Sequence, residues 1–399
     1  MKLLVCPSGF KGSIEPHTAA DCIERGIIRV DPDATIRKVP LADGGEGFAS
    51  ALTMATNGKM RYLSVIGPVG APIPSYYGIL GGCGPKTAAI EIAAAAGLSL
   101  VPDHSRNPCV TTSFGVGQLI AAALDEGVQR IVIGCGDSGT NDGGSGMLEA
   151  LGARLTDKTG KVLARASGGQ SLTLLAHIDF SGLDIRLKDV HIEVACNWQN
   201  VLCGPNGVAR VYGPQKGATP EQTERLAGAL DNYARVAHET LGIDISDAPG
   251  TGASGGLGAG FILMGAELRP RYEAIMEYFN LDDLFDDCDL IFTAEGGIDF
   301  QTPRGKIPAE VAMRAKKKGL PVIVLAGTIG ADADVNYEVG INAYASILQK
   351  PMTLEDAMKE AERLLMESAE CAMRMVVVGR KLASQAAAHD ASNSFVGRK

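Results

Sequence analysis

The chain has 399 residues, a length typical of two domains. Its net charge is −9 and it has no block rich in lysine and arginine, which argues against a nucleic-acid partner because a phosphate backbone needs a positive surface. Aromatic residues make up only 5% of the chain and glycine contributes 50 residues, so the core must consist mainly of Ala, Val, Ile and Leu, as in buried parallel sheets.

The cysteines and the short apolar runs bear on the cellular compartment of the protein. Nine cysteines, an odd number without a C-x-x-C pair, make a disulfide framework improbable. The N-terminal apolar run, residues 3–6, is too short for a signal peptide, and no stretch approaches the roughly 18–20 apolar residues that span a bilayer. We therefore expect a cytoplasmic protein without a membrane partner.

The first half of the chain begins as a β-α-β unit. Apolar spacing predicts a strand over residues 2–6, a helix over 16–30 and a strand over 35–39. A Gly-rich turn from Asp43 to Gly47 leads into a helix from Phe48. After it, the predicted elements are strands at 62–66, 75–80 and 87–92, a helix at 111–126, a strand at 130–133 and a loop at 134–146.

The second half returns to strands that alternate with helices. The predicted elements are a strand at 192–196, turns at 203–217, a helix at 220–241, a glycine loop at 249–260, a strand at 288–293, a helix at 308–318, a strand at 321–326 and a helix at 353–376. The last twenty residues are either a helix extension or a mobile tail.

These elements predict an α/β protein of two domains. Residues 1–60 and 284–399 are expected to form a discontinuous Rossmann-like domain, and residues 61–283 an inserted second α/β domain. The glycine loops follow predicted strands, whose carboxyl ends form the ligand crevice of open α/β sheets.

The glycine loops are candidates for phosphate binding, because Gly lets backbone N–H groups approach an anion. A tight turn without a ligand is the competing interpretation of each loop. No Walker A motif and no protein-kinase motif set is present. The first β-α junction, from Cys6 to Ser13, lacks G-x-G-x-x-G, which argues against a dinucleotide-dependent reductase.

Eight segments, in order along nearly the whole chain, resemble the glycerate kinase family of the bacterial type that makes 2-phosphoglycerate. They are Phe10-Lys-Gly-Ser13, Ala42-Asp-Gly-Gly-Glu-Gly47, Thr140-Asn-Asp-Gly-Gly144, Leu202-Cys-Gly-Pro-Asn-Gly207, Gly213-Pro-Gln-Lys-Gly-Ala218, Ala253-Ser-Gly-Gly-Leu-Gly258, Gly265-Ala-Glu-Leu-Arg-Pro270 and Arg304-Gly-Lys306. The resemblance implies two unlike α/β domains around a cleft and a kinase that uses ATP with Mg²⁺ to phosphorylate D-glycerate. We expect a monomer or a homodimer.

The catalytic candidates are Asp43, Lys11 and Asp142. Asp43 is the candidate general base, since a carboxylate in a turn with neighbouring glycines is open to substrate, although it could instead cap the helix from Phe48. Substrate and phosphate contacts are assigned to Ser13, Glu46, Thr140, Asn141, Asn206, Lys216, Gly255, Gly256, Arg304 and Lys306. Glu295 and Asp299 are the candidate magnesium ligands, with a helix cap as the alternative for Asp299.

The chain departs from the family's pattern at several polar positions, which are Ser8, Asp137, Asn197 to Gln199, Ala294 and Gly297. Unchanged chemistry in a subfamily is one interpretation. A kinase for a related small hydroxy acid and a small-acid sensor with impaired turnover are the others.

Overall fold

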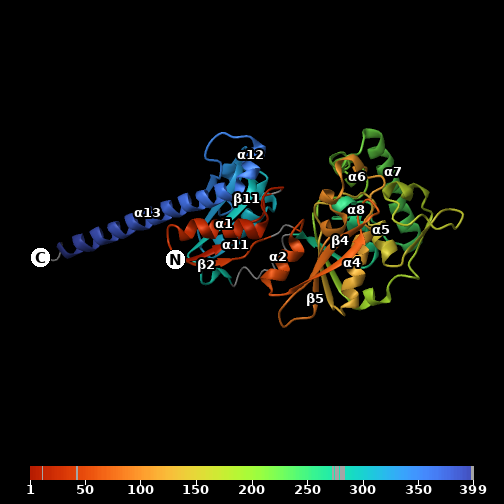
Figure 1. Ribbon diagram of the computed structural model, residues 1–399, viewed down its shortest axis with the longest axis horizontal. Coiled ribbons are helices and arrows are strands. Elements are labelled where there is room, and N and C mark those ends of the chain that lie inside the picture. Colours follow the sequence, from red (N-terminus) through yellow and green to blue (C-terminus); the bar gives the residue numbers. More distant parts are fainter. Residues whose placement is uncertain (11, 42–43, 272–273, 275–277, 279–283, 397–399) are drawn as a thin grey trace. The chain divides into compact units, whose positions relative to one another are not determined.

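The computed structural model describes residues 1–10, 12–41, 44–271, 274, 278 and 284–396 (Figure 1). The chain divides into two compact units. Unit 1 comprises Met1–Leu41 with Asn280–Lys399, and unit 2 comprises Ala42–Phe279. Both units combine helices with β-sheets, so the predicted α/β class is confirmed.

Unit 1 is built on a five-stranded parallel sheet in the order β13-β12-β11-β1-β2. Leu3 of β1 lies opposite Leu290 of β11 on one side and Ile36 of β2 on the other. The strands are β1 (Lys2–Val5), β2 (Thr35–Lys38), β11 (Leu290–Ile298), β12 (Val322–Ile329) and β13 (Ala343–Ser346). The three inner strands, β1, β11 and β12, are mostly apolar and buried, as expected of a sheet covered by helices, whereas the edge strands β2 and β13 are largely exposed.

The helices of unit 1 are α1 (Pro16–Ile28), η6 (Thr302–Arg304), α11 (Ile307–Lys317), η7 (Ala333–Tyr337), α12 (Leu354–Lys359) and α13 (Ala361–Val396). α1 and α13 pack so closely that a Cβ added to Gly26 would lie 2.3 Å from the Met366 carbonyl oxygen. α13 is buried as far as Met373 and then runs outward, exposing Val378 and Leu382 (Figure 1). The helix is therefore longer than the predicted 353–376, and its last part is the helix extension that was one of the two alternatives.

Unit 2 contains a six-stranded mixed sheet in the order β10-β9-β6-β5-β4-β3. β3 and β4 form an antiparallel hairpin, while β5, β6, β9 and β10 are parallel. The strands are β3 (Lys59–Ile66), β4 (Pro72–Ile79), β5 (Thr87–Glu91), β6 (Arg130–Gly134), β9 (His191–Cys196) and β10 (Glu267–Pro270), and a separate pair is β7 (Arg154–Thr156) with β8 (His177–Asp179). The parallel strands bring the loops that follow β5, β6 and β9 to one edge of the sheet.

The helices of unit 2 include α2 (Phe48–Ala55), α3 (Ala93–Ala96), α4 (Phe114–Asp125), α5 (Ser145–Ala150), α6 (Val208–Tyr212), α7 (Pro220–Leu241) and α8 (Ala253–Leu263). Shorter 3₁₀ turns are η1 (Leu98–Leu100), η2 (Asp103–Ser105), η3 (Gly169–Leu174), η4 (Ile185–Asp189) and η5 (Pro214–Lys216). α7 begins with a capping box, in which Thr219 accepts from the Gln222 backbone N–H and Gln222 accepts in return.

Two predicted boundaries differ from the structure. The boundary between the units falls before residue 42 rather than after residue 60, because α2 packs on the unit 2 sheet. Thr53 of α2 lies so close to Gly78 of β4 that a Cβ added to Gly78 would be 1.7 Å from the Thr53 hydroxyl oxygen. The predicted glycine loop at 249–260 is wrong from Leu257 onward, where the regular helical part of α8 begins despite its glycines; Ser254, Gly255 and Gly256 before it have non-helical backbone angles.

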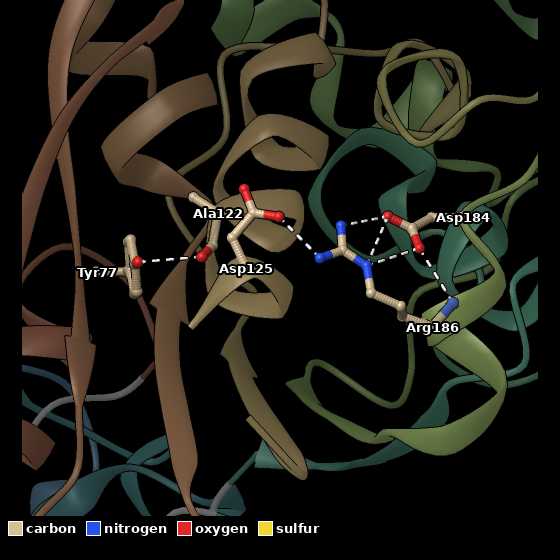
Figure 2. A network of polar contacts seen from close by, with 5 residues as sticks. All are labelled: Tyr77, Ala122, Asp125, Asp184 and Arg186. Carbon is tan, nitrogen blue, oxygen red and sulfur yellow. Dashed lines mark hydrogen bonds and ion pairs between the residues drawn. The ribbon is translucent and has the colours of Figure 1, made fainter. Parts of the chain in front are cut away.

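A polar network holds the edge of the unit 2 sheet where the strands begin (Figure 2). Arg186, in the turn that leads into β9, bonds both oxygens of Asp184 and reaches Asp125 at 2.7 Å at the end of α4, which leads into β6. The Tyr77 hydroxyl donates to the Ala122 carbonyl at 3.2 Å. Tyr77 lies within β4, but Asp125, Asp184 and Arg186 lie before the amino ends of β6 and β9, whereas the glycine loops follow carboxyl ends.

Candidate active site

The glycine loop Gly44–Gly47 lies across the carboxyl ends of β6 and β9. A Cβ added to Gly44 would be 3.5 Å from both the Ala195 oxygen and the Cys135 nitrogen. A Cβ on Gly136 would lie 2.8 Å from the Gly45 Cα, closer than two carbon atoms can approach. Gly44 and Gly47 also adopt φ of 88° and 86°, which only glycine adopts easily. The loop therefore needs glycine for both its conformation and its contacts.

Glu46 is the exposed polar residue of this loop. Its backbone N–H donates to Asp137 Oδ2 at 3.3 Å, and its carboxylate accepts a hydrogen bond from the Ser99 hydroxyl. The loop after β6 thus fixes the backbone of Glu46 through Asp137, one of the residues that depart from the family's pattern. Asp43, the candidate general base, lies outside the described residues.

The first turn of α2 is capped by Glu91, which comes from the end of β5. The Gly47 and Ala49 backbone N–H groups donate to its carboxylate at 3.2 and 2.8 Å. Burial raises the pKa of Glu91 above its ordinary value. The competing interpretation of Asp43 was a cap of this helix. Glu91 already accepts from the Gly47 and Ala49 N–H groups that such a cap would bind. Sequence reasoning missed Glu91, whose one signal is a charged residue at the end of an apolar strand.

Lys216 is buried, with 3% of its surface exposed, and it ties the loop after β6 together. Its Nζ donates to Ser138 Oγ at 2.8 Å, to the Thr140 carbonyl at 2.7 Å and to Asn141 Oδ1 at 3.0 Å. Three oxygen acceptors fit the three protons of an ammonium group. Burial nevertheless lowers the pKa of Lys216 to about 7, although Asp142 and Cys135 counteract the shift. The lysine predicted to bind phosphate is therefore engaged by protein oxygens.

Asp142 is fully buried and its carboxylate accepts four hydrogen bonds. Ser113 donates to Oδ2 from its backbone at 2.7 Å and from its hydroxyl at 2.9 Å. The Gly144 and Gly146 N–H groups donate at 3.1 and 3.3 Å. Burial raises the pKa of Asp142, while these donors lower it. Asp142, a predicted catalytic residue, is placed so that it joins α4 to the start of α5.

Thr140 and Asn141 are buried and carry polar atoms that the protein leaves unused. Within the described part of the chain, neither Thr140 Oγ1 nor Asn141 Nδ2 has a hydrogen-bond partner. A buried polar atom without a partner costs free energy and marks a place where a ligand or water is expected to bind. Of the residues predicted in this loop, these two therefore fit a phosphate contact best.

Gly255 and Gly256 lie against the same loop. Together with Ser254 they adopt left-handed φ values of 52°, 76° and 90° at the start of α8. A Cβ on Gly255 would be 1.8 Å from the Thr140 oxygen, and Gly255 accepts a hydrogen bond from the Gly143 N–H at 3.1 Å. Packing alone explains glycine at these two positions. Asn206 is exposed in the turn before α6.

The candidate residues of unit 1 gather after β11. Asp299 Oδ1 accepts from the Gln301 N–H at 2.8 Å and forms an ion pair with Lys306 at 3.5 Å. Lys306 also donates to the Gly297 carbonyl at 3.0 Å. Asp299 thus bonds the turn that leads into η6, whose N-cap residue is Gln301, while half-buried Glu295 lies in β11 itself.

The remaining unit 1 candidates are Ser13, Lys11 and Arg304, and only Ser13 has a described side chain. The exposed Ser13 donates through Oγ to the Met358 carbonyl at 2.9 Å. Lys11 lies outside the described residues, and Arg304 is described only in its backbone, within η6. Ser8, which departs from the family's pattern, follows β1. Its Oγ donates to the Ala294 carbonyl of β11 at 2.9 Å, so the hydroxyl links the end of β1 to β11.

A comparison with known families identifies the chain. The model of the glycerate kinase family matches residues 3–377. The chain belongs to the glycerate kinase family. The resemblance read from the eight segments is thereby confirmed, and the family region ends just before the part of α13 that leaves the core.

Glycerate kinase relatives match nearly end to end. The chain is 44% identical over 370 residues to the glycerate kinase of Bacillus subtilis, which covers 92% of this chain and 96% of that protein. It is 45% identical to the glycerate 2-kinase of Escherichia coli, covering 90% and 94%. A crystal structure of a candidate glycerate kinase 2 from Salmonella typhimurium LT2 has a TM-score of 0.81 and 43% identity, covering 96% of this chain and all of that one, 100%.

Proposed function

We propose that this member of the glycerate kinase family transfers the γ-phosphoryl group of ATP to the 2-hydroxyl of D-glycerate, forming 2-phosphoglycerate. The observation that carries the proposal is the nearly full-length similarity to the Escherichia coli glycerate 2-kinase. At this level of identity, both the reaction and the position of the new phosphate are expected to be retained.

The chemistry requires few protein groups, because phosphoryl transfer depends mainly on positioning and on stabilising charge. We assign Asp43 to the acceptor hydroxyl, as the base that orients or deprotonates it. Asn141 and Thr140 are assigned to phosphate oxygens, since their buried polar atoms have no partner among the described residues. Lys11, Arg304 and Lys306 are the cations assigned to the substrate carboxylate or a phosphate.

Magnesium is part of the proposal, and Glu295 in β11 and Asp299 directly after it are carboxylates of the kind that binds this ion. Mg²⁺ prefers one or two carboxylates and completes its shell with water and phosphate oxygens. Glu295 and Asp299 would supply such oxygens, although Asp299 Oδ1 already accepts a backbone N–H. No group of three or more metal-binding side chains occurs in the part of the chain that the structure describes. When bound, the ion would neutralise charge on the donor phosphates.

The setting is proposed to be the cytoplasm. All nine cysteines are free, as in a reducing compartment. Among the described residues, no helix is both long enough and apolar enough to cross a bilayer. The oligomeric state, monomer or homodimer, stays a prediction.

The test is direct. Purified protein with Mg-ATP and D-glycerate should release ADP and yield one new phosphorus resonance, that of the 2-phosphate. L-glycerate, glycolate and lactate serve as the comparison panel. Only 3-phosphoglycerate as product would refute the assigned hydroxyl. Turnover of another hydroxy acid alone would favour an altered pocket, and no turnover with any acid would favour a sensor.

A further inference from the structure

Glu91 is a fully buried carboxylate that none of the roles assigned above uses. It ends β5, and both of its oxygens accept hydrogen bonds. Oε1 accepts from the Tyr76 hydroxyl at 2.7 Å and from the Gly47 N–H at 3.2 Å, and Oε2 accepts from the Ala49 N–H at 2.8 Å. A buried carboxylate is costly unless it is well bonded, so these three donors account for its presence in the core.

The position of these donors gives Glu91 a particular task. Gly47 is the N-cap of α2 and has no side chain with which to cap the helix. Glu91 supplies the missing acceptor from a neighbouring strand, and its negative charge faces the positive end of the helix. The end of the Gly44–Gly47 loop and the first turn of α2 are thereby attached to β5.

The other side of the loop is fixed independently. Gly44 packs on the carboxyl ends of β6 and β9, and the Glu46 N–H donates to Asp137 after β6. Three adjacent strands of one sheet therefore hold a loop of four residues. A surface turn does not need contacts to three strands. Contacts of this kind are expected where the rate of a reaction depends on the exact position of a nearby group.

We propose that Glu91 is a positioning residue for phosphoryl transfer, which holds the Gly44–Gly47 loop in the geometry that turnover requires. This inference rests on the proposed function, which assigns Asp43, next to this loop in the sequence, to the acceptor hydroxyl.

Glu91→Gln tests the proposal because it keeps the size of the side chain but turns one acceptor oxygen into an NH₂ group that faces an N–H donor. We expect kcat with D-glycerate and Mg-ATP to fall by about tenfold to hundredfold, since displacements near 1 Å have effects of that size. KM for Mg-ATP should change by less than about twofold, because the loop is assigned to the acceptor. Amide hydrogen exchange at Gly47 and Ala49 should accelerate.

Asp184→Ala is the matched control. Asp184 also caps a helical turn in unit 2, by accepting from the Arg186 N–H at 3.0 Å, but it lies before the amino end of β9 (Figure 2). This variant should keep wild-type kcat. Tyr76→Phe removes one donor and leaves both backbone bonds, so kcat should fall by about twofold to fivefold; this variant carries the test if Glu91→Gln does not fold.

The outcomes separate the two hypotheses. Wild-type kcat in Glu91→Gln despite faster exchange at Gly47 and Ala49 would overturn the positioning role, as would an equal loss in Asp184→Ala. With Glu91→Gln unfolded, wild-type kcat in Tyr76→Phe would also overturn it. A rise in KM for Mg-ATP at unchanged kcat would do the same. A wild-type enzyme without turnover on D-glycerate would refute the proposed function and this inference together.

Discussion

The Nζ atom of Lys216 donates a hydrogen bond to Asn141 Oδ1 at 3.0 Å, and this contact decides how the asparagine amide is oriented. An ammonium group is only a donor, so the amide must turn its oxygen toward the lysine and its Nδ2 the other way. Nδ2 is buried, and no described residue accepts from it. Lys216 thus presets Asn141 as a donor, the role that an anionic phosphate oxygen requires.

Lys216→Met should lower both stability and activity. The variant keeps an unbranched apolar stem but removes three hydrogen bonds and leaves three buried acceptors unsatisfied. We expect the free energy of unfolding to fall by about 1–3 kcal/mol and kcat/KM for Mg-ATP to fall at least about tenfold. Urea unfolding and initial rates measure the two effects. Lys158→Met, at an exposed position after β7, is the control, and equal kcat/KM in both variants would contradict the role of Lys216.

Glu149 predicts a pH dependence of stability. Its carboxylate in α5 accepts from the Ala166 N–H at 3.0 Å, and burial raises its pKa from 4.5 to about 7. The folded protein therefore binds this proton more tightly than the unfolded chain does. The resulting stability is complete below pH 4.5 and is lost as the pH rises through 7.

Relative to Glu149→Gln, which does not titrate, wild type should lose about 3 kcal/mol of unfolding free energy between pH 4.5 and pH 8. Urea unfolding of both proteins across this range measures the difference. A difference that stays constant with pH would show that Glu149 has an ordinary pKa.

Local patterns sufficed to predict many elements of this fold. The apolar run 130–133 lies in β6, and the turn-linked pair at 62–66 and 75–80 lies in the β3–β4 hairpin. Helix α8 could not be recognised in this way, because its glycines lower helix propensity. They are there for close contacts that no local pattern reveals: a Cβ on Gly258 would lie 2.0 Å from the Gly250 oxygen.

The candidate site was predictable as a set of glycine loops but not as a set of roles. Lys216 and Asn141 are far apart in sequence, and only the fold shows that they bond each other rather than leaving both free for a ligand. Glu91 and Ala49 are likewise joined only by the sheet. The roles of Asp43 and the other assigned residues in catalysis stay predictions.

Gly255→Ala should be among the most damaging small substitutions in unit 2. The new methyl would lie 1.8 Å from the Thr140 oxygen, in a backbone with φ of 76° that alanine rarely adopts. We expect a loss of at least about 2 kcal/mol in unfolding free energy, together with lost activity, because the clash displaces the Thr140–Asn141 loop.

Gly228→Ala is the opposite case and the control. Gly228 lies in α7 with no atom within 4 Å of its added Cβ. Alanine there should raise the free energy of unfolding by about 0.4–1 kcal/mol without changing kcat. Denaturant unfolding of the two variants measures the contrast, and a Gly255→Ala protein as stable as wild type would show that the loop and α8 do not pack as described.

Asp43→Asn should reduce turnover with little effect on stability. Asparagine keeps the size and a possible capping oxygen of aspartate but cannot act as a base. A general base contributes about 10² to 10⁴ in rate, so kcat should fall within that range. The Gly47 and Ala49 N–H groups at the start of α2 already bond Glu91, which is why the melting temperature should stay close to that of wild type.

Asp142→Asn provides the contrast, because four donors face that carboxylate and an amide cannot accept them all. It should melt at a clearly lower temperature, whereas Asp43→Asn should lose rate alone. Initial rates at saturating D-glycerate and Mg-ATP, with thermal unfolding of the same preparations, distinguish the two. Wild-type kcat in a well-folded Asp43→Asn protein would remove Asp43 from catalysis, and Glu46, the other carboxylate of that loop, would then be the residue to substitute, since it is exposed and its side chain bonds only Ser99 among its described contacts.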